Sequence, residues 1–169
     1  MPSSLEQVAA ILGYKLNRKQ CLIAANDSNY IAGMFQLGAT RVEVDEIRRL
    51  DRACQGVTDL QEKQAVEDLK RNLVCIDDLY IVFTSLDRFS PITDRLYPYK
   101  HLIIYNDSEM VYYGEMKLRL VSLFHTYLAN GDMYYGGGDH GFLGTVSCRF
   151  TKDELLSFIE KIKSIYRHG

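Results

Sequence analysis

The spacing of apolar residues predicts three clear helices. Apolar positions recur at intervals of three and four, the period of one helix face, over residues 4–12, 58–73 and 151–167. A weaker stripe of the same kind leaves residues 42–54 ambiguous. Each of the three clear segments opens with two residues at the spacing of a capping box, namely Ser4 with Gln7, Thr58 with Gln61, and Thr151 with Glu154.

Other short segments carry the β-branched and aromatic residues that are typical of strands. These are residues 21–25, 30–35, 79–84, 101–105, 110–113, 133–135 and 145–150. Turn-forming residues at 106–109 predict a β-hairpin between two of them. Residues 116–128 fit both periods, and the helical stripe there, followed by Asn130 and Gly131, favours a helix.

Together these elements predict an α+β fold in a single domain that spans residues 1–169. Strands joined by tight turns favour a mainly antiparallel sheet, and we expect the helices to pack on one face of it. A chain of 169 residues is long enough to bury a core without a disulfide or a metal.

The charge of the chain argues against direct binding to nucleic acid. The formal net charge is −2, and acidic and basic residues interleave over residues 43–49, whereas nucleic-acid-binding domains usually carry a basic stripe. The first residues lack the basic and apolar regions of a signal peptide, and no segment has the apolar length of a membrane span. We therefore expect a cytoplasmic protein that does not associate with a membrane.

The cysteines do not form the close pairs of a metal site. Cys21, Cys54, Cys75 and Cys148 stand far apart, which argues against a zinc ribbon. The acidic residues likewise lack the spacing of a calcium-binding loop. We expect four reduced and mostly buried thiols, and neither a metal nor a cofactor.

One glycine-rich loop contains candidate catalytic residues. The loop from Gly136 to Gly141 holds Asp139 and His140, and a histidine beside an aspartate can act as a general base. It leads into a predicted strand and lacks the lysine and hydroxyl residue of a phosphate-binding loop. A small intracellular hydrolase or transferase that uses His140 and Asp139 is therefore an alternative function, and it would need a third group such as His101.

Tyrosine is the unusual feature of the composition, since the chain has 12 Tyr and no Trp. Most tyrosines lie in the C-terminal half, and several of these are on predicted strands, where they could fill the core or form a rigid contact surface. The second interpretation predicts a protein-binding module with acidic residues around the aromatic rows. Its candidate contact residues are Tyr112, Tyr113, Tyr134, Tyr135, Asp107, Glu109, Asp139 and His140.

The end of the chain passes directly from a predicted strand into a capped helix, over residues 147–160 with the sequence SCRFTKDELLSFIE. With the small size and the tyrosine-rich strands, this ending resembles bacterial immunity proteins of polymorphic-toxin and contact-dependent inhibition systems. The resemblance implies a cytosolic protein that binds one toxin and blocks its active site. It carries over no site residues, because such proteins share no signature. For a nuclease toxin, we expect the surface of the partner to be basic.

Overall fold

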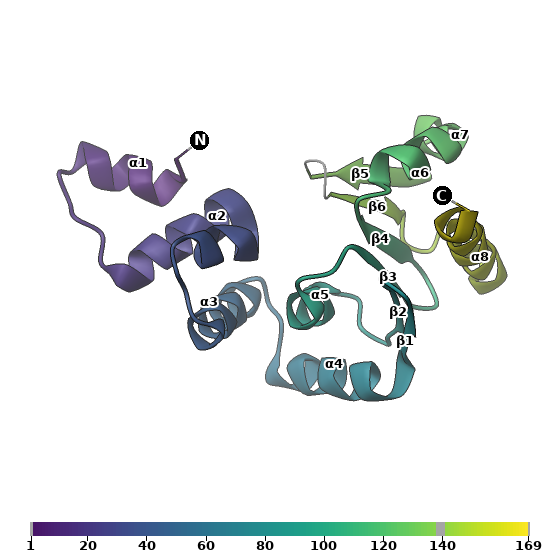
Figure 1. The fold of residues 1–169 in the computed structure, drawn as a ribbon, viewed down its shortest axis with the longest axis horizontal. Helices are drawn as coiled ribbons and strands as arrows, with labels where there is room; N and C mark the ends of the chain where they lie inside the picture. The colour runs from purple at the N-terminus through teal and green to yellow at the C-terminus, as the bar shows by residue number, and fades with distance from the viewer. Residues whose placement is uncertain (1, 138–140, 169) are drawn as a thin grey trace. The chain divides into compact units, whose positions relative to one another are not determined.

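Helices alone form the first part of the chain, and the strands of the described residues all lie after residue 72 (Figure 1). The structure, a computed structural model, describes residues 2–137 and 141–168. Its internal contacts divide the chain into two compact units, Met1–Thr58 and Asp59–Gly169, where the sequence predicts one domain. The difference arises because the first unit buries apolar residues of its own, among them Leu22, Met34 and Val44.

The first unit consists of the helices α1 (Ser4–Ile11), α2 (Arg18–Gln36) and α3 (Arg41–Cys54). A capping box opens each helix, and at α1 it lies one residue earlier than the sequence predicts. The three boxes are Ser3 with Glu6, Asn17 with Gln20, and Thr40 with Glu43. The helix α2 replaces the two strands predicted at 21–25 and 30–35, so that prediction is wrong.

A kink divides α2, and a buried arginine lies beside it. Asn29 and Tyr30 have non-helical backbone angles, and the φ of Tyr30 is +52°. Arg48 of α3 is buried, and its Nη1 donates to Asn26 Oδ1 over 3.0 Å and to Asp51 Oδ2 over 2.5 Å. Its guanidinium carbon lies 4.5 Å from the centre of the Tyr30 ring, a cation–π contact. The turn-forming composition of residues 26–29 therefore marks a kink rather than a strand turn.

The second unit contains a six-stranded sheet with the strand order β1-β2-β3-β4-β6-β5. Neighbouring strands are antiparallel except β2 and β3, which are parallel because α5 connects them. The elements are α4 (Asp59–Asn72), β1 (Leu73–Ile76), β2 (Leu79–Phe83), α5 (Ser90–Leu96), β3 (His101–Tyr105), β4 (Met110–Gly114), α6 (Lys117–Leu123), α7 (His125–Ala129), β5 (Met133–Gly136), β6 (Phe142–Thr145) and α8 (Lys152–His168).

The predicted α+β fold with a mainly antiparallel sheet is confirmed, including the β3–β4 hairpin and the helical region after residue 116. The strand predicted at 145–150 lies earlier, over β6, and residues 146–150 form a turn into α8. Thr151 and Glu154 form the predicted capping box, since the backbone N–H of Thr151 donates to Glu154 Oε2 over 2.8 Å.

Helices cover both faces of the sheet, so the prediction of a single covered face is wrong (Figure 1). The helices α6, α7 and α8 pack on the face that carries Ile103 and Tyr112. On the opposite face, α4 and α5 pack against Leu102 and Ile104. The reason is that successive residues of the central strands are both apolar, and successive side chains point to opposite faces. Both faces must therefore be buried.

The cysteines are more exposed than the sequence predicts. Cys54, Cys75 and Cys148 are exposed and Cys21 is half-buried. Cys75 lies on the edge strand β1 and Cys148 in the turn before α8, where the sheet does not enclose them. The prediction of mostly buried thiols is therefore wrong. No helix of the described residues has both the length and the apolar character needed to cross a bilayer.

Candidate functional site

Alternate residues of β4, β6 and β5 form one aromatic face of the sheet. The register places Tyr113 of β4 beside Phe142 of β6, and Tyr134 of β5 beside Gly144 of β6. Because side chains alternate along a strand, these residues point to the same face as Val111. That face is covered by α4 and α5 over the other end of the sheet.

The rings on this face form a continuous series of edge contacts, which we call the aromatic strip. Its members are Tyr97, Tyr99, Tyr113, Phe142 and Tyr134. Successive ring centres lie 6.2, 6.3, 6.4 and 6.0 Å apart, and the planes are tilted or nearly perpendicular. These are the geometries that aromatic pairs prefer, so each ring restricts the position of the next.

Two glycines allow rings of the strip to lie close to the sheet. A Cβ atom at Gly144 would lie 2.7 Å from Cζ of Tyr134, and one at Gly136 would lie 2.8 Å from Cζ of Phe142. Each ring therefore occupies the space that a side chain on the neighbouring strand would fill. The pairing of an aromatic ring with a cross-strand glycine lets Tyr134 and Phe142 lie close to the backbone of the neighbouring strand.

The strip consists of uncharged rings, and the carboxyl groups of Glu109 and Asp94 lie near its tyrosines. Burial raises the pKa of Tyr134, and the Glu109 carboxylate adds to this effect. Burial also raises the pKa of Tyr113, helped by the neighbouring Tyr99 and Tyr134. Burial, with a contribution from Asp87, raises the pKa of Glu109 itself. A half-buried carboxyl group next to the rings favours a partner that supplies a hydrogen-bond donor or a positive charge at this point.

The structure brings together three of the candidate contact residues, namely Tyr113, Tyr134 and Glu109. Tyr134 is 41% exposed. Tyr112 lies on the opposite face and is fully buried in the core against α6 and α8, so its prediction as a contact residue is wrong. The physical reason is strand alternation: Tyr112 and Tyr113 are adjacent and must point to opposite faces.

The remaining candidates are separate from the strip. Tyr135 is 55% exposed but points to the face opposite Tyr134, and Asp107 lies in the β3–β4 turn, where it accepts from Lys152 Nζ over 2.7 Å. Asp139 and His140 lie outside the described residues, so the structure does not test their predicted roles.

Sequence reasoning missed three members of the strip, Tyr97, Tyr99 and Phe142. Phe142 could have been predicted from its position two residues before Gly144, because residues two apart on a strand point to the same face. Tyr97 and Tyr99 lie in the loop between α5 and β3, and their contacts depend on tertiary structure alone.

On the other face of the sheet, a cluster of hydrogen-bonded side chains surrounds His101. Its Nδ1 lies 2.7 Å from Oη of Tyr112, which also accepts from the backbone N–H of Met116 over 3.0 Å. His101 accepts from the Tyr112 hydroxyl when its Nδ1 is unprotonated and donates to it when Nδ1 carries the proton. The ring of Tyr166 packs edge-on against His101 at 5.3 Å, and its Oη accepts from the backbone N–H of Asp78 over 3.0 Å.

These contacts make the His101 cluster a structural element, and they predict a pH dependence of stability. Burial lowers the pKa of His101 from its usual 6.5, and Lys100 adds to this effect, whereas Glu115 and Asp78 oppose it. The folded chain then binds fewer protons than the unfolded chain between the two pKa values. The free energy of unfolding should therefore fall as the pH drops below 6.5 toward the folded-state pKa.

Urea unfolding of the native chain and of His101→Asn at about pH 7.5 and about pH 5.5 measures this effect. Asparagine keeps a polar group near the Tyr112 hydroxyl but does not titrate. Changes at other groups, including Glu109, are common to both proteins and cancel. We expect the native chain to lose more stability than the variant on acidification, and equal losses would contradict the assignment.

Among residues 2–137 and 141–168, no three His, Cys, Asp or Glu side chains are grouped so that they could hold a metal ion. The chain matches no protein-family model, and no curated protein is significantly similar to it in sequence. The aromatic strip is therefore the feature of the chain from which its function can be inferred.

Proposed function

We propose that the chain is a protein-binding module whose contact surface is the aromatic strip with Glu109 at its rim. The observation that carries the proposal is the uninterrupted series of rings, which runs from the core beside α4 and α5 to the exposed Tyr134 and has two of its rings over glycines. Tyrosine offers a large apolar area with few rotatable bonds, and it is enriched where proteins bind one another.

The more specific proposal is that the chain is an immunity protein, which binds a toxin in the bacterial cytoplasm and blocks its active site. The resemblance of residues 147–160 suggests this class, and Glu109 beside the strip suits a basic partner. Nuclease toxins have such basic surfaces because they attract phosphate backbones. The partner to test first is the protein encoded by the neighbouring reading frame, co-expressed with this chain and purified through a tag on one of them.

Removal of the most exposed ring of the strip should weaken binding. We expect Tyr134→Ala to lower the affinity for the co-expressed partner by about 2 kcal/mol or more, as for a binding hot spot. The matched control is Tyr14→Ala, which removes a 55% exposed tyrosine from the first unit. Equal affinities of the two variants, measured by titration calorimetry, would show that the strip is not the contact surface.

A variant that displaces the Tyr134 ring without removing it tests the geometry of the strip. A methyl group at Gly144 would occupy the place of the Tyr134 ring, and the backbone of Gly144 does not require glycine. We expect Gly144→Ala to weaken binding in the native background and to have little further effect in the Tyr134→Ala background. Such non-additivity is what a shared structural cause produces, whereas additive losses would argue against it.

A further inference from the structure

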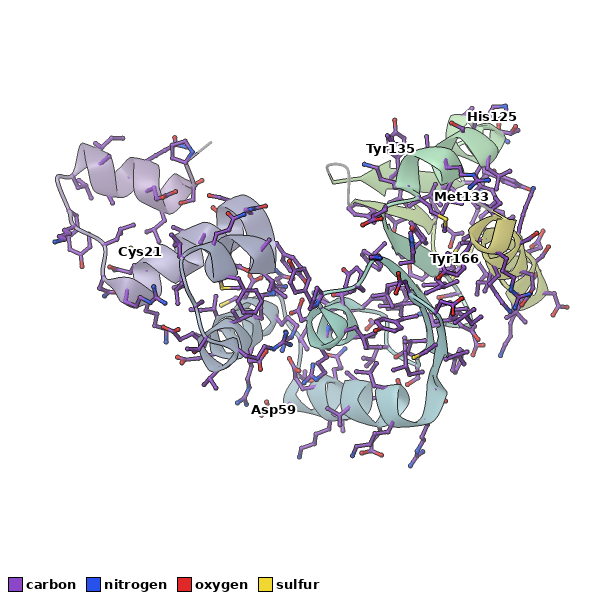
Figure 2. The ribbon with its side chains drawn as sticks, viewed as in Figure 1. Cys21, Asp59, His125, Met133, Tyr135 and Tyr166 are labelled. Atoms are coloured by element: carbon purple, nitrogen blue, oxygen red, sulfur yellow. The ribbon has the colours of Figure 1, made fainter. Side chains whose placement is uncertain are left out.

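The strand β5 (Met133–Gly136) ends the sheet on one side, and among the described residues it pairs with β6 alone (Figure 1). Tyr134 and Tyr135 of this strand are 41% and 55% exposed. Figure 2 shows Tyr135 at the outer end of the sheet, while Met133 lies toward the core. The outer edge of β5 is therefore accessible to another strand.

Two backbone hydrogen bonds determine which groups of β5 face this edge. The N–H of Val146 donates to Asp132 O over 2.9 Å, and the N–H of Gly114 donates to Gly141 O over 3.0 Å. In an antiparallel pair, hydrogen-bonded residues alternate with residues whose groups point the other way. Asp132, Tyr134 and Gly136 therefore bond toward β6. The N–H and C=O groups of Met133 and Tyr135 point to the open edge.

This edge carries no charge, proline or bulge that would prevent another strand from pairing with it. Natural edge strands are commonly protected by a lysine, a proline or a β-bulge. The sequence of β5 is Met-Tyr-Tyr-Gly, which has no charge and no proline, and its register with β6 is continuous over all four residues. Nothing on the strand would repel a second uncharged strand.

We propose that two copies of the chain pair antiparallel through β5, with the twofold axis at Tyr134. The outward-facing residues Met133 and Tyr135 lie symmetrically on either side of Tyr134. In this single register, Met133 of each copy exchanges both backbone hydrogen bonds with Tyr135 of the other. A twofold interface needs such self-complementarity, and a strand of a different protein would not require it. The pairing does not depend on the proposed function.

The pairing would join the two aromatic strips. The twofold axis of an antiparallel pair is perpendicular to the sheet, so both copies present the same face on the same side. The two Tyr134 residues would form a pair without backbone hydrogen bonds, the closer of the two antiparallel arrangements. Their Cα atoms would lie close together at the axis, with each ring over its own Gly144, so the two strips would continue on one face of the dimer.

Sedimentation velocity over a wide concentration range tests the pairing. The native chain should associate reversibly to a dimer. Tyr135→Pro removes the outward N–H of each copy and leaves the bonds to β6 intact, whereas Tyr135→Ala keeps this N–H. We expect the dimer dissociation constant of the proline variant to exceed that of the alanine variant about tenfold or more. Equal constants would overturn the proposal.

Disulfide trapping tests the register without a proline. In a background in which the exposed Cys54, Cys75 and Cys148 are replaced by serine, Tyr134→Cys places two thiols across the axis. The Cα atoms of such a pair lie about 4.5 Å apart, within the range of a disulfide. We expect mild oxidation to cross-link this variant much faster than Tyr135→Cys. Equal or reversed rates would overturn the register.

A native chain that stays monomeric at every concentration would overturn the pairing itself. The edge of β5 would then be left for a segment of a different protein. This result would not affect the proposed function, because the Tyr134→Ala and Tyr14→Ala comparison measures binding of the co-expressed partner and needs no dimer.

Discussion

Replacement of Gly114 by alanine is expected to lower the free energy of unfolding by about 3 kcal/mol or more. Gly114 ends β4 with a φ of +133°, a conformation that side chains rarely adopt. A Cβ atom there would overlap the carbonyl oxygen of Lys100 and lie 2.9 Å from its carbonyl carbon. Backbone atoms of the neighbouring strand cannot move aside as a flexible side chain can, so the sheet itself would have to shift.

The matched control is Gly131→Ala. Gly131 also has a positive φ, +73°, but a Cβ atom there would have no neighbour within 4 Å. It should therefore show the cost of the backbone conformation alone, about 1 kcal/mol. Urea unfolding of both variants measures the difference. A Gly114→Ala variant no less stable than the Gly131→Ala variant would mean that β3 and β4 do not approach as closely as described.

Replacement of Arg48 by methionine is expected to destabilise the first unit by about 2–4 kcal/mol. Methionine keeps most of the apolar stem but removes the charge and the donors. The variant loses the ion pair with Asp51, the hydrogen bond to Asn26 and the cation–π contact with Tyr30. The cost is large because the Arg48 side chain is only 8% exposed, so water cannot replace these contacts.

The control for Arg48 is Arg41→Met on the same helix. Arg41 pairs with Asp45 over 2.9 Å, but both side chains are well exposed, so the loss should be about 1 kcal/mol or less. Amide hydrogen exchange measured on peptides from α2 and α3 reports the stability of this unit directly. Equal exchange rates in the two variants would show that Arg48 does not hold the kinked helix against α3.

The kinked helix α2 also shows where prediction from the sequence fails. Residues 26–29 have the composition of a turn, so the pattern favours two strands, although Gly33 weakens the prediction of the second one. In the structure, a Cβ atom at Gly33 would lie 2.6 Å from the carbonyl oxygen of Ala25 across the kink. The glycine permits a close approach between the two halves of one helix. This contact joins two residues across a break in the helix and leaves no periodic signal.

The predictions for the second unit succeeded where local pattern and tertiary structure agree. The β3–β4 hairpin follows from two β-rich segments around a four-residue turn, and the start of α8 follows from Thr151 and Glu154. Alternation also separates Tyr112 from Tyr113. It does not say which of them faces the helices α6 and α8, because that depends on how the chain crosses the sheet. The contact surface could therefore be predicted only in part.

The pairing of rings with glycines constrains how this sequence can change. Tyr134 occupies the space above Gly144, and Phe142 the space above Gly136. A larger residue at either glycine is compatible with the flat sheet face only if the facing ring is lost or becomes smaller. In homologous sequences we therefore expect positions 134 and 144, and positions 136 and 142, to vary together. Each pair would act as one inherited character, in which an aromatic residue on one strand is accompanied by glycine on the next.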